Sequence, residues 1–214
     1  MQTRWVLMVA ALLASAPATA QTPGAPRGDA SVSLGWLHSD VSALSRGEDN
    51  WALGRLTLAG QAGFYWTEHL KTEVVAERSD HEDVFIGESI LLPAGRTAWR
   101  STQHDIQDTR LSIGQFYQFG RNTWAHVSVG AGVSVTWRDI TSETSPLIVY
   151  DRSGQQQLEP GSTRTSADTR TNAFAALALK AYLTPRAFFR SDLQTDFRSS
   201  IDNLAVRVGF GMDF

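Results

Sequence analysis

The chain contains no cysteine among its 214 residues, so no disulfide can hold its fold together. Beyond its N-terminus it has no run of about 18 apolar residues, the length that a membrane-spanning helix would need. It also lacks a basic excess, because 19 lysines and arginines stand against 22 aspartates and glutamates. That balance argues against a nucleic-acid-binding protein. Stability must come from packing, sheet pairing or the surrounding medium, and any membrane crossing must use strands.

The N-terminus has the features of a secretory signal peptide. A short cationic start, MQTR, precedes the apolar run WVLMVAALLASA and a small-residue stretch that ends at Ala20. The apolar run is about a dozen residues, shorter than the ~20 of a spanning helix. We therefore expect a signal peptide over residues 1–20, cleavage between Ala20 and Gln21, and a flexible Pro/Gly leader over residues 21–30.

From residue 31 onward, apolar and polar residues alternate with a period of two, and the pattern returns eight times. The clearest example is TWAHVSVGAGVSVTW, residues 123–137, in which apolar residues alternate with serine, glycine, threonine and one histidine. Successive side chains of a strand point to opposite faces, so this period predicts strands and not helices. The eight segments are 31–38, 50–66, 70–79, 108–119, 123–137, 168–183, 187–197 and 203–214.

The connections between these segments alternate between tight and long. Residues 67–69, 120–122 and 184–186 have the polar, Gly and Pro chemistry of tight turns. The intervening connections 39–49, 80–107, 138–167 and 198–202 are mostly longer. Short turns on one rim, longer loops on the other and an even strand number are the plan of an outer-membrane barrel. We therefore expect an all-β fold, a transmembrane eight-stranded antiparallel up-and-down β-barrel over residues 31–214.

A soluble β-sandwich would show the same alternation, so the partner of the apolar face needs separate evidence. Small residues such as Gly130 and Gly132 crowd the polar faces, which suits a narrow lumen. Aromatic residues gather at both ends of the strands, for example Trp66 at one end and Trp137 at the other, as in the two girdles of a membrane barrel. The strands also reach the 9 to 11 residues that a tilted strand needs to cross a bilayer. These features favour lipid.

The chain ends in NLAVRVGFGMDF, residues 203–214, with hydrophobic residues at every second position and a final phenylalanine. On this ending, and over the mature length, the chain resembles the small eight-stranded outer-membrane barrels of Gram-negative bacteria, the OmpA-, OmpX- and OmpW-like group. The resemblance implies an outer-membrane location among lipid and lipopolysaccharide, and insertion by the barrel-assembly machinery, which reads the last strand. It places this assembly signal on Val208, Phe210, Met212 and Phe214. Many members carry an aromatic residue where this chain has Met212.

The polar faces of the strands carry charges of both signs that we expect to point into the lumen. An eight-stranded lumen is only wide enough for side chains to fill it, and buried charges must be paired. We therefore predict a plug of salt bridges, with Asp192 opposite Arg207 on neighbouring strands. The predicted inward charges are Arg55, Lys71, Arg110, Arg170, Lys180, Arg190 and Arg207, with Glu73, Glu77, Asp108, Asp192, Asp196 and Asp213.

Enzymes on this fold exist, so the pair His126 and Ser128 has to be weighed. The alternation points both side chains into the lumen near the short-turn rim, and no acidic partner can be assigned, so a hydrogen-bonded interior histidine is the better interpretation. The acidic run 80–83 is interpreted as a solvated loop and not as a cation site. We expect no cofactor and no catalytic site.

The two longest connections carry more apolar residues than loops normally do, including Phe85 and the segment Leu147 to Tyr150. Either the strands continue past the barrel or the loops pack over its mouth; either arrangement could present a surface for a ligand. We expect an envelope structural or surface-interaction protein with a plugged lumen. The alternative is a narrow channel or conduit for small hydrophobic or ionic solutes.

Overall fold

The computed structural model describes residues 27–39, 53–92, 96–119, 124–150, 156–198 and 201–214. The predicted signal peptide, its cleavage site and the leader as far as residue 26 lie outside these ranges. Within them, no helix is long and apolar enough to span a membrane. The strands are β1 (Gly28–Ser39), β2 (Leu53–Tyr65), β3 (Leu70–Ser79), β4 (Glu82–Leu92), β5 (Arg96–Phe119), β6 (Ala125–Thr144), β7 (Leu147–Tyr150), β8 (Gln156–Glu159), β9 (Ser162–Tyr182), β10 (Ala187–Phe197) and β11 (Ile201–Asp213).

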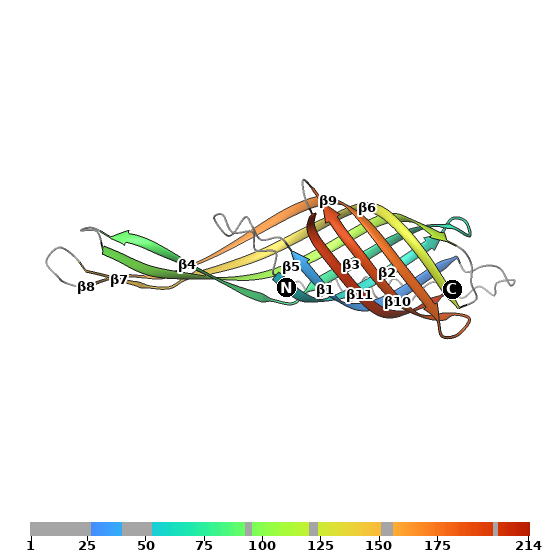
Figure 1. The fold of residues 1–214 in the computed structure, drawn as a ribbon, viewed down its shortest axis with the longest axis horizontal. Helices are drawn as coiled ribbons and strands as arrows, with labels where there is room; N and C mark the ends of the chain where they lie inside the picture. Colours follow the sequence, from blue (N-terminus) through green and yellow to red (C-terminus); the bar gives the residue numbers. More distant parts are fainter. Residues whose placement is uncertain (1–26, 40–52, 93–95, 120–123, 151–155, 199–200) are drawn as a thin grey trace.

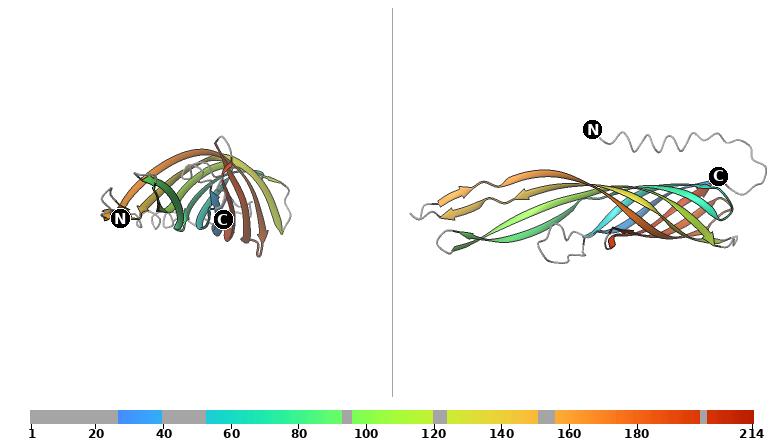
Figure 2. Two further views of the ribbon diagram at one scale, coloured as in Figure 1. Left: turned by 60° about the vertical axis from the view of Figure 1, so that its left-hand side comes forward. Right: turned by 90° about the horizontal axis from the view of Figure 1, so that it is seen from above.

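Eight of these strands close into a barrel (Figures 1 and 2). Around the ring the order is β3-β2-β1-β11-β10-β9-β6-β5, every pairing is antiparallel, and β3 pairs with β5 to close the circle. Closure leaves no free sheet edge in the barrel wall, because each strand pairs with a neighbour on both sides. The predicted eight-stranded antiparallel barrel is confirmed.

The two longest predicted connections are strands and not loops. β4 and the N-terminal part of β5 form one hairpin, while β6 and β9 continue as a second pair as far as Thr144 and Ser162. These strands project well beyond the barrel and lie on the left of Figure 1. Of the two explanations that the sequence left open, continued strands is therefore the correct one. We call β4, residues 96–107 of β5, residues 138–144 of β6, β7, β8 and residues 162–167 of β9 the projection.

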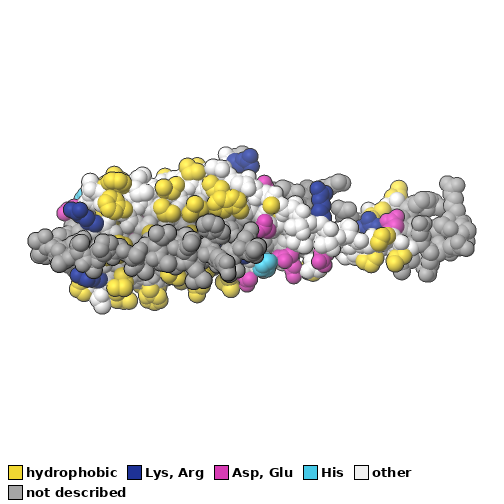
Figure 3. All heavy atoms as spheres, turned by 180° about the vertical axis from the view of Figure 1, so that it is seen from behind, with side chains coloured by type: hydrophobic (Ala, Val, Ile, Leu, Met, Phe, Trp, Pro, Cys, Tyr) yellow, Lys and Arg dark blue, Asp and Glu magenta, His cyan; other side chains and the backbone are white. Residues whose placement is uncertain are grey.

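The barrel is apolar outside and polar inside, the reverse of a soluble domain. Leu34, Ile113 and Phe210 are examples of large apolar side chains that are more than half exposed on the outer wall. In Figure 3 hydrophobic side chains spread over the barrel wall, and acidic side chains gather where the barrel passes into the projection. Such a wall is stable only against an apolar solvent, which supports the predicted lipid contact.

The first and last residues that the structure describes, Arg27 and Phe214, meet at the short-turn rim. The carbonyl of Phe214 accepts hydrogen bonds from the backbone N–H groups of Arg27 and Gly28, both at 3.0 Å. β1 already begins at Gly28, so the last three residues of the predicted leader, 28–30, belong to the barrel. The register pairs residues 29–39 of β1 with residues 203–213 of β11.

Candidate functional site

The lumen of the barrel holds the candidate site, a set of buried charges of both signs. Within the described residues, seven acidic and seven basic side chains are buried, so the set is formally neutral. They are Asp29, Glu73, Glu77, Asp108, Asp192, Asp196 and Asp213, with Arg55, Lys71, Arg110, Arg138, Lys180, Arg190 and Arg207.

At the short-turn rim, two lysines share one carboxylate. Lys71 Nζ lies 3.1 Å from Asp29 Oδ2, and Lys180 Nζ contacts the same oxygen. Lys180 also lies 3.0 Å from Asp213 Oδ1, whose second oxygen accepts a 2.5 Å hydrogen bond from the Tyr182 hydroxyl. Two cations and two anions thus balance one another in a single cluster.

Deeper in the lumen, Arg190 organises the next group. Its two terminal nitrogens donate to both carboxylate oxygens of Glu73 at 2.7 and 2.6 Å, a bidentate pair. Its Nε donates to Asp192 at 2.6 Å, and the other oxygen of Asp192 accepts from Gln61 at 2.8 Å. Each of the three guanidinium nitrogens of Arg190 therefore donates to a carboxylate oxygen.

A third group centres on Glu77, which accepts from two arginines. Arg207 Nη1 donates to it at 3.0 Å, and Arg110 contacts the same oxygen. Arg110 Nη1 in turn donates to Asp196 at 2.9 Å. The register pairs Asp192 with Arg207, as the sequence predicts, but the two charges are 3.7 Å apart and each has a closer partner.

The mouth of the lumen, on the side of the projection, is closed by Asp108. Arg138 binds its two oxygens at 2.8 and 2.9 Å, and Arg55 donates to Asp108 Oδ2 at 2.6 Å. Arg55 also donates to Ser39 at 2.7 Å. These side chains come from β5, β6, β2 and β1, so the cluster spans the opening.

The structure changes the predicted set of inward charges at three positions. Arg170 is only half-buried at the mouth, where it pairs with Asp168 at 2.6 Å. Asp29 and Arg138 are buried members outside the predicted set, because they lie in the predicted leader, 21–30, and in the predicted connection 138–167. Both continue the two-residue alternation of Ser31 and Thr136, so extending that pattern by one step would have found them.

Three phenylalanines fill the lumen beside these charges, and sequence reasoning missed them. Phe116, Phe174 and Phe188 are buried on the polar face of their strands. Each ring lies over a glycine of a neighbouring strand, where an added Cβ would meet it. The pairs are Phe116 with Gly130, Phe174 with Gly132 and Phe188 with Gly211. The glycines on the inner face thus make room for the rings. A phenylalanine at an inward position of the alternation is the sequence signal that would have predicted this packing.

A patch of polar atoms on the β6–β9 wall has no hydrogen-bond partner among the described residues. It consists of Ser134 Oγ, Thr136 Oγ1 and both side-chain atoms of the Asn172 amide. All three residues are buried, and Ser134 faces Asn172 across the ladder. Buried polar groups of this kind are commonly bound to water.

The histidine of the pair His126 and Ser128 contacts a tyrosine of β9. His126 Nδ1 lies 3.3 Å from the Tyr182 hydroxyl, and the two rings pack edge to face. Ser128 is buried in the lumen wall. In the acidic run, His81 pairs with Asp105 at 2.9 Å, and within the described ranges no three metal-ligating side chains cluster.

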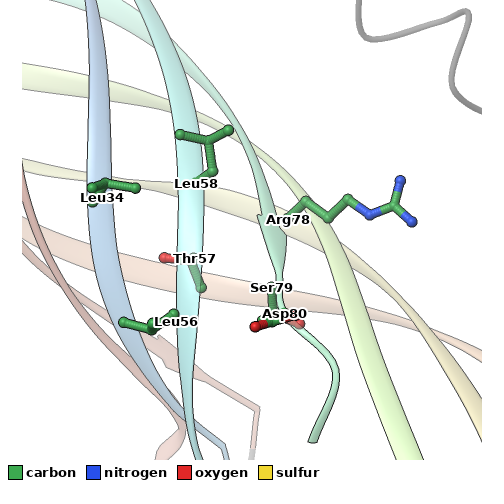
Figure 4. Close-up of a pocket in the computed structure, with 7 residues that line it drawn as sticks. All are labelled: Leu34, Leu56, Thr57, Leu58, Arg78, Ser79 and Asp80. Carbon is green, nitrogen blue, oxygen red and sulfur yellow. The ribbon is translucent and has the colours of Figure 1, made fainter.

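A hollow of about 300 Å³ lies on the outside of the barrel and not in the lumen (Figure 4). Leu34 of β1 and Leu56 and Leu58 of β2 line it, and Arg78 extends away from it at the end of β3. Thr57, Ser79 and Asp80 complete the lining. The hollow therefore belongs to the lipid-facing surface.

The residues of the predicted assembly signal lie on one face of the C-terminal part of β11 and at the residue that follows it. The outward, exposed residues are Val208, Phe210, Met212 and Phe214. The ring of Phe210 packs edge to face on that of Phe189 of β10, with the ring centroids 5.5 Å apart. Their role in assembly stays a prediction.

Comparisons with known proteins agree with this architecture. Residues 6–214 match the model of the outer membrane protein beta-barrel domain. The crystal structure of OprG from Pseudomonas aeruginosa is similar over 91% of this chain and 99% of its own, at 14% identity and a TM-score of 0.54. The N-terminal barrel domain of Pseudomonas aeruginosa OprF is similar over 89% and 100%, at 12% identity and a TM-score of 0.50.

Ail, the attachment invasion locus protein of Yersinia pestis, is similar over 88% of this chain and 99% of its own, at 13% identity and a TM-score of 0.50. Identities this low show a common fold and nothing finer. No curated protein matches the chain. The chain belongs to the outer membrane protein beta-barrel domain family, and it is a β-barrel of the bacterial outer membrane.

Proposed function

We propose that this protein is a non-catalytic outer-membrane barrel whose lumen is plugged by its charge network and whose projection acts at the cell surface. The barrel then serves as an anchor, and the projection provides the surface for interaction. Insertion by the barrel-assembly machinery through the last strand is part of the same proposal.

The observation that carries the plug is the pair of Arg190 on β10 and Glu73 on β3. Three strands separate β10 from β3 in either direction around the ring, so this bidentate pair crosses the full width of the lumen. Contacts between Arg207 and Glu77 and between Arg110 and Asp196 cross it at another level. A solute would have to break several buried pairs to pass.

Conductance of the purified protein in planar bilayers tests the plug. We expect no steady openings at moderate voltage, because each level of the lumen is bridged. Long, stable openings of a size typical of porins would contradict the proposal.

A variant without the projection tests its surface role. Residues 83–105 and 139–166 would each be replaced by a short Asn-Gly turn, which leaves the eight barrel strands paired. We expect this variant to refold in micelles, and we expect proteoliposomes of the intact protein, but not those of the variant, to bind lipopolysaccharide or matrix proteins. Equal binding by both proteins would contradict a role for the projection.

The Ail structure contains the heparin analogue sucrose octasulfate, but a polyanion is not the ligand that this chain favours. Residues 80–107 and 138–167 together carry nine acidic and five basic residues. Repulsion would weaken the binding of a sulfated sugar to such a surface. A neutral or only locally anionic partner fits better.

The unpartnered patch of Ser134, Thr136 and Asn172 keeps a narrow conduit as the second candidate. Water bound there would form a polar seam beside the salt bridges. Proton leak into liposomes loaded with a pH dye tests it. A leak that Asn172→Leu abolishes would favour the conduit, whereas a leak-free protein supports the plug.

A further inference from the structure

On the inner wall near the mouth of the lumen, the register of β5, β6 and β9 brings five polar side chains together. Thr136 of β6 lies opposite Arg110 of β5 on one side and opposite Arg170 of β9 on the other. One rung deeper into the lumen, Ser134 lies opposite Asn172. Residues that oppose each other directly have Cβ atoms about 4.5 to 5.5 Å apart, so these side chains share one small region. We call Ser134, Thr136 and Asn172 the polar patch.

The polar patch presents hydrogen-bond donors that no group among the described residues accepts. They are the hydroxyls of Ser134 and Thr136 and the amide nitrogen of Asn172, and the Nε–H of Arg110 is unpartnered as well. All four residues are 4% exposed or less. A buried donor without a partner costs free energy, so these groups need an acceptor that is not part of the chain.

Arg110 is positioned to turn its free donor toward the polar patch. Its two terminal nitrogens donate to Asp196 of β10 and Glu77 of β3. The Nε–H is the part of the guanidinium that these two carboxylates leave unused, and Thr136 is the direct partner of Arg110 across the ladder. A positive charge with an unused donor therefore borders the patch on the side of β5.

The carboxylates on the same wall are already bound by arginines. Asp108 and Asp168 lie one rung nearer the mouth than Thr136. Arg138 binds both oxygens of Asp108 at 2.8 and 2.9 Å, and Arg170 binds Asp168 at 2.6 Å. Because these negative charges are paired at the mouth and cations are the direct neighbours of Thr136, an anion in the patch meets attraction.

The balance of donors and acceptors favours an anion over a water molecule. A water molecule donates two hydrogen bonds of its own, whereas the carbonyl of Asn172 is the one atom of the polar patch that only accepts. A halide ion accepts and donates nothing, and hydroxyl, amide and guanidinium groups are all suitable donors to it. Hydrogen bonds to an ion are also about twice as strong as those between neutral groups.

We propose that the polar patch binds one small inorganic anion, chloride, which accepts hydrogen bonds from its three side chains and from the Nε–H of Arg110. The ion enters from the mouth, where Arg170 is partly exposed. It goes no deeper, because the ring of Phe174 covers Gly132 at the next rung. This inference goes beyond the proposed function, since the plug forms whether or not the ion is bound.

The first test measures stability against chloride concentration. The full chain is refolded in micelles of an uncharged detergent, and gluconate, an anion too large for the patch, replaces chloride at constant ionic strength. Urea unfolding gives the folding equilibrium constant. A single site that only the folded protein has predicts that, above its Kd, each tenfold increase in chloride raises this constant about tenfold. Stability that does not depend on chloride would overturn the proposal and leave the plug intact.

Variants of the wall assign this dependence to the polar patch. Thr136→Val removes one hydroxyl with little change of shape and should weaken chloride binding about tenfold. In gluconate it should be no less stable than the wild type, because an unpartnered hydroxyl is lost. Arg170→Gln should weaken binding by a smaller factor, since solvent screens its charge. Ser128→Ala removes a buried hydroxyl of β6 outside the patch and should keep the full dependence. The same dependence in all four proteins would overturn the proposal.

Bromide locates the ion directly, because it replaces chloride in protein sites and scatters X-rays anomalously. In crystals of the refolded protein soaked in sodium bromide, we expect one anomalous peak within hydrogen-bond reach of Thr136 and Asn172. Crystals of Thr136→Val should show a weaker peak or none. Water alone at the patch, or a bromide peak of the same height in the variant, would overturn the proposal.

Discussion

Phe174 and Gly132 are direct partners across the β6–β9 ladder, and the phenyl ring covers the glycine. A Cβ at position 132 would lie 2.1 Å from the carbonyl oxygen of Ile113 and 2.8 Å from Cε1 of Phe174. Gly132→Val should therefore lower the free energy of unfolding by about 1 to 3 kcal/mol, the usual effect of overpacking. Urea titration in micelles measures it. Ala131→Val, on the outer face next to it, is the control and should be close to neutral.

Removal of the carboxylate of Glu73 should destabilise the barrel strongly. Glu73→Gln leaves Arg190 and Lys71 buried with too little negative charge, which should lower the free energy of unfolding by about 3 kcal/mol, the low end for a broken buried pair. The double variant with Arg190→Met should lose less than the two single losses added together. Glu143→Gln, on an exposed residue of the projection, should be neutral. Additive losses in the double variant would show that the pair is not coupled.

The final phenylalanine should matter for assembly more than for stability. Because the Phe214 ring faces lipid at the rim of the outer wall, where polar substitutions cost about 0 to 1 kcal/mol, Phe214→Ser should lower the free energy of unfolding of the refolded protein by no more than Phe119→Ser does. The amount that reaches the outer membrane in cells should fall several-fold if the last strand is the assembly signal, as membrane fractionation would show. Phe119→Ser, another exposed aromatic residue at the same rim, is the control. Equal losses for both variants would remove the special role of Phe214.

Acidification should loosen the base of the projection. Partial burial lowers the pKa of His104 below its ordinary value of 6.5, and its Nδ1 lies 2.7 Å from the Ser142 hydroxyl. Because the unfolded segment takes up its proton first, stability present above pH ~6.5 should decrease as the pH falls through the lowered folded pKa. Hydrogen exchange of residues 100–106 and 138–144 at several pH values measures this. In His104→Gln the pH dependence should disappear.

Much of this fold could be predicted from the sequence because one side of every barrel strand meets a different medium from the other. The alternation in residues 123–137 needs no tertiary information to place Ser134 inside and Val133 outside. Where that contrast fades, the prediction failed. Residues 82–92 and 96–107 mix apolar and polar side chains on both faces, so a period of two does not single them out as strands.

Taken alone, the sequence determined the strand period, the number of barrel strands, the outward apolar wall and the sign of most inward charges, because these depend only on which face a residue occupies. Only the tertiary structure decided which charges meet. Glu73 and Arg190 are 117 residues apart, and their contact depends on the strand order and stagger of the closed ring. The same closure put phenyl rings over glycines. Neighbours across a lumen or along a wall are set by three-dimensional geometry, which alternation along one strand does not contain.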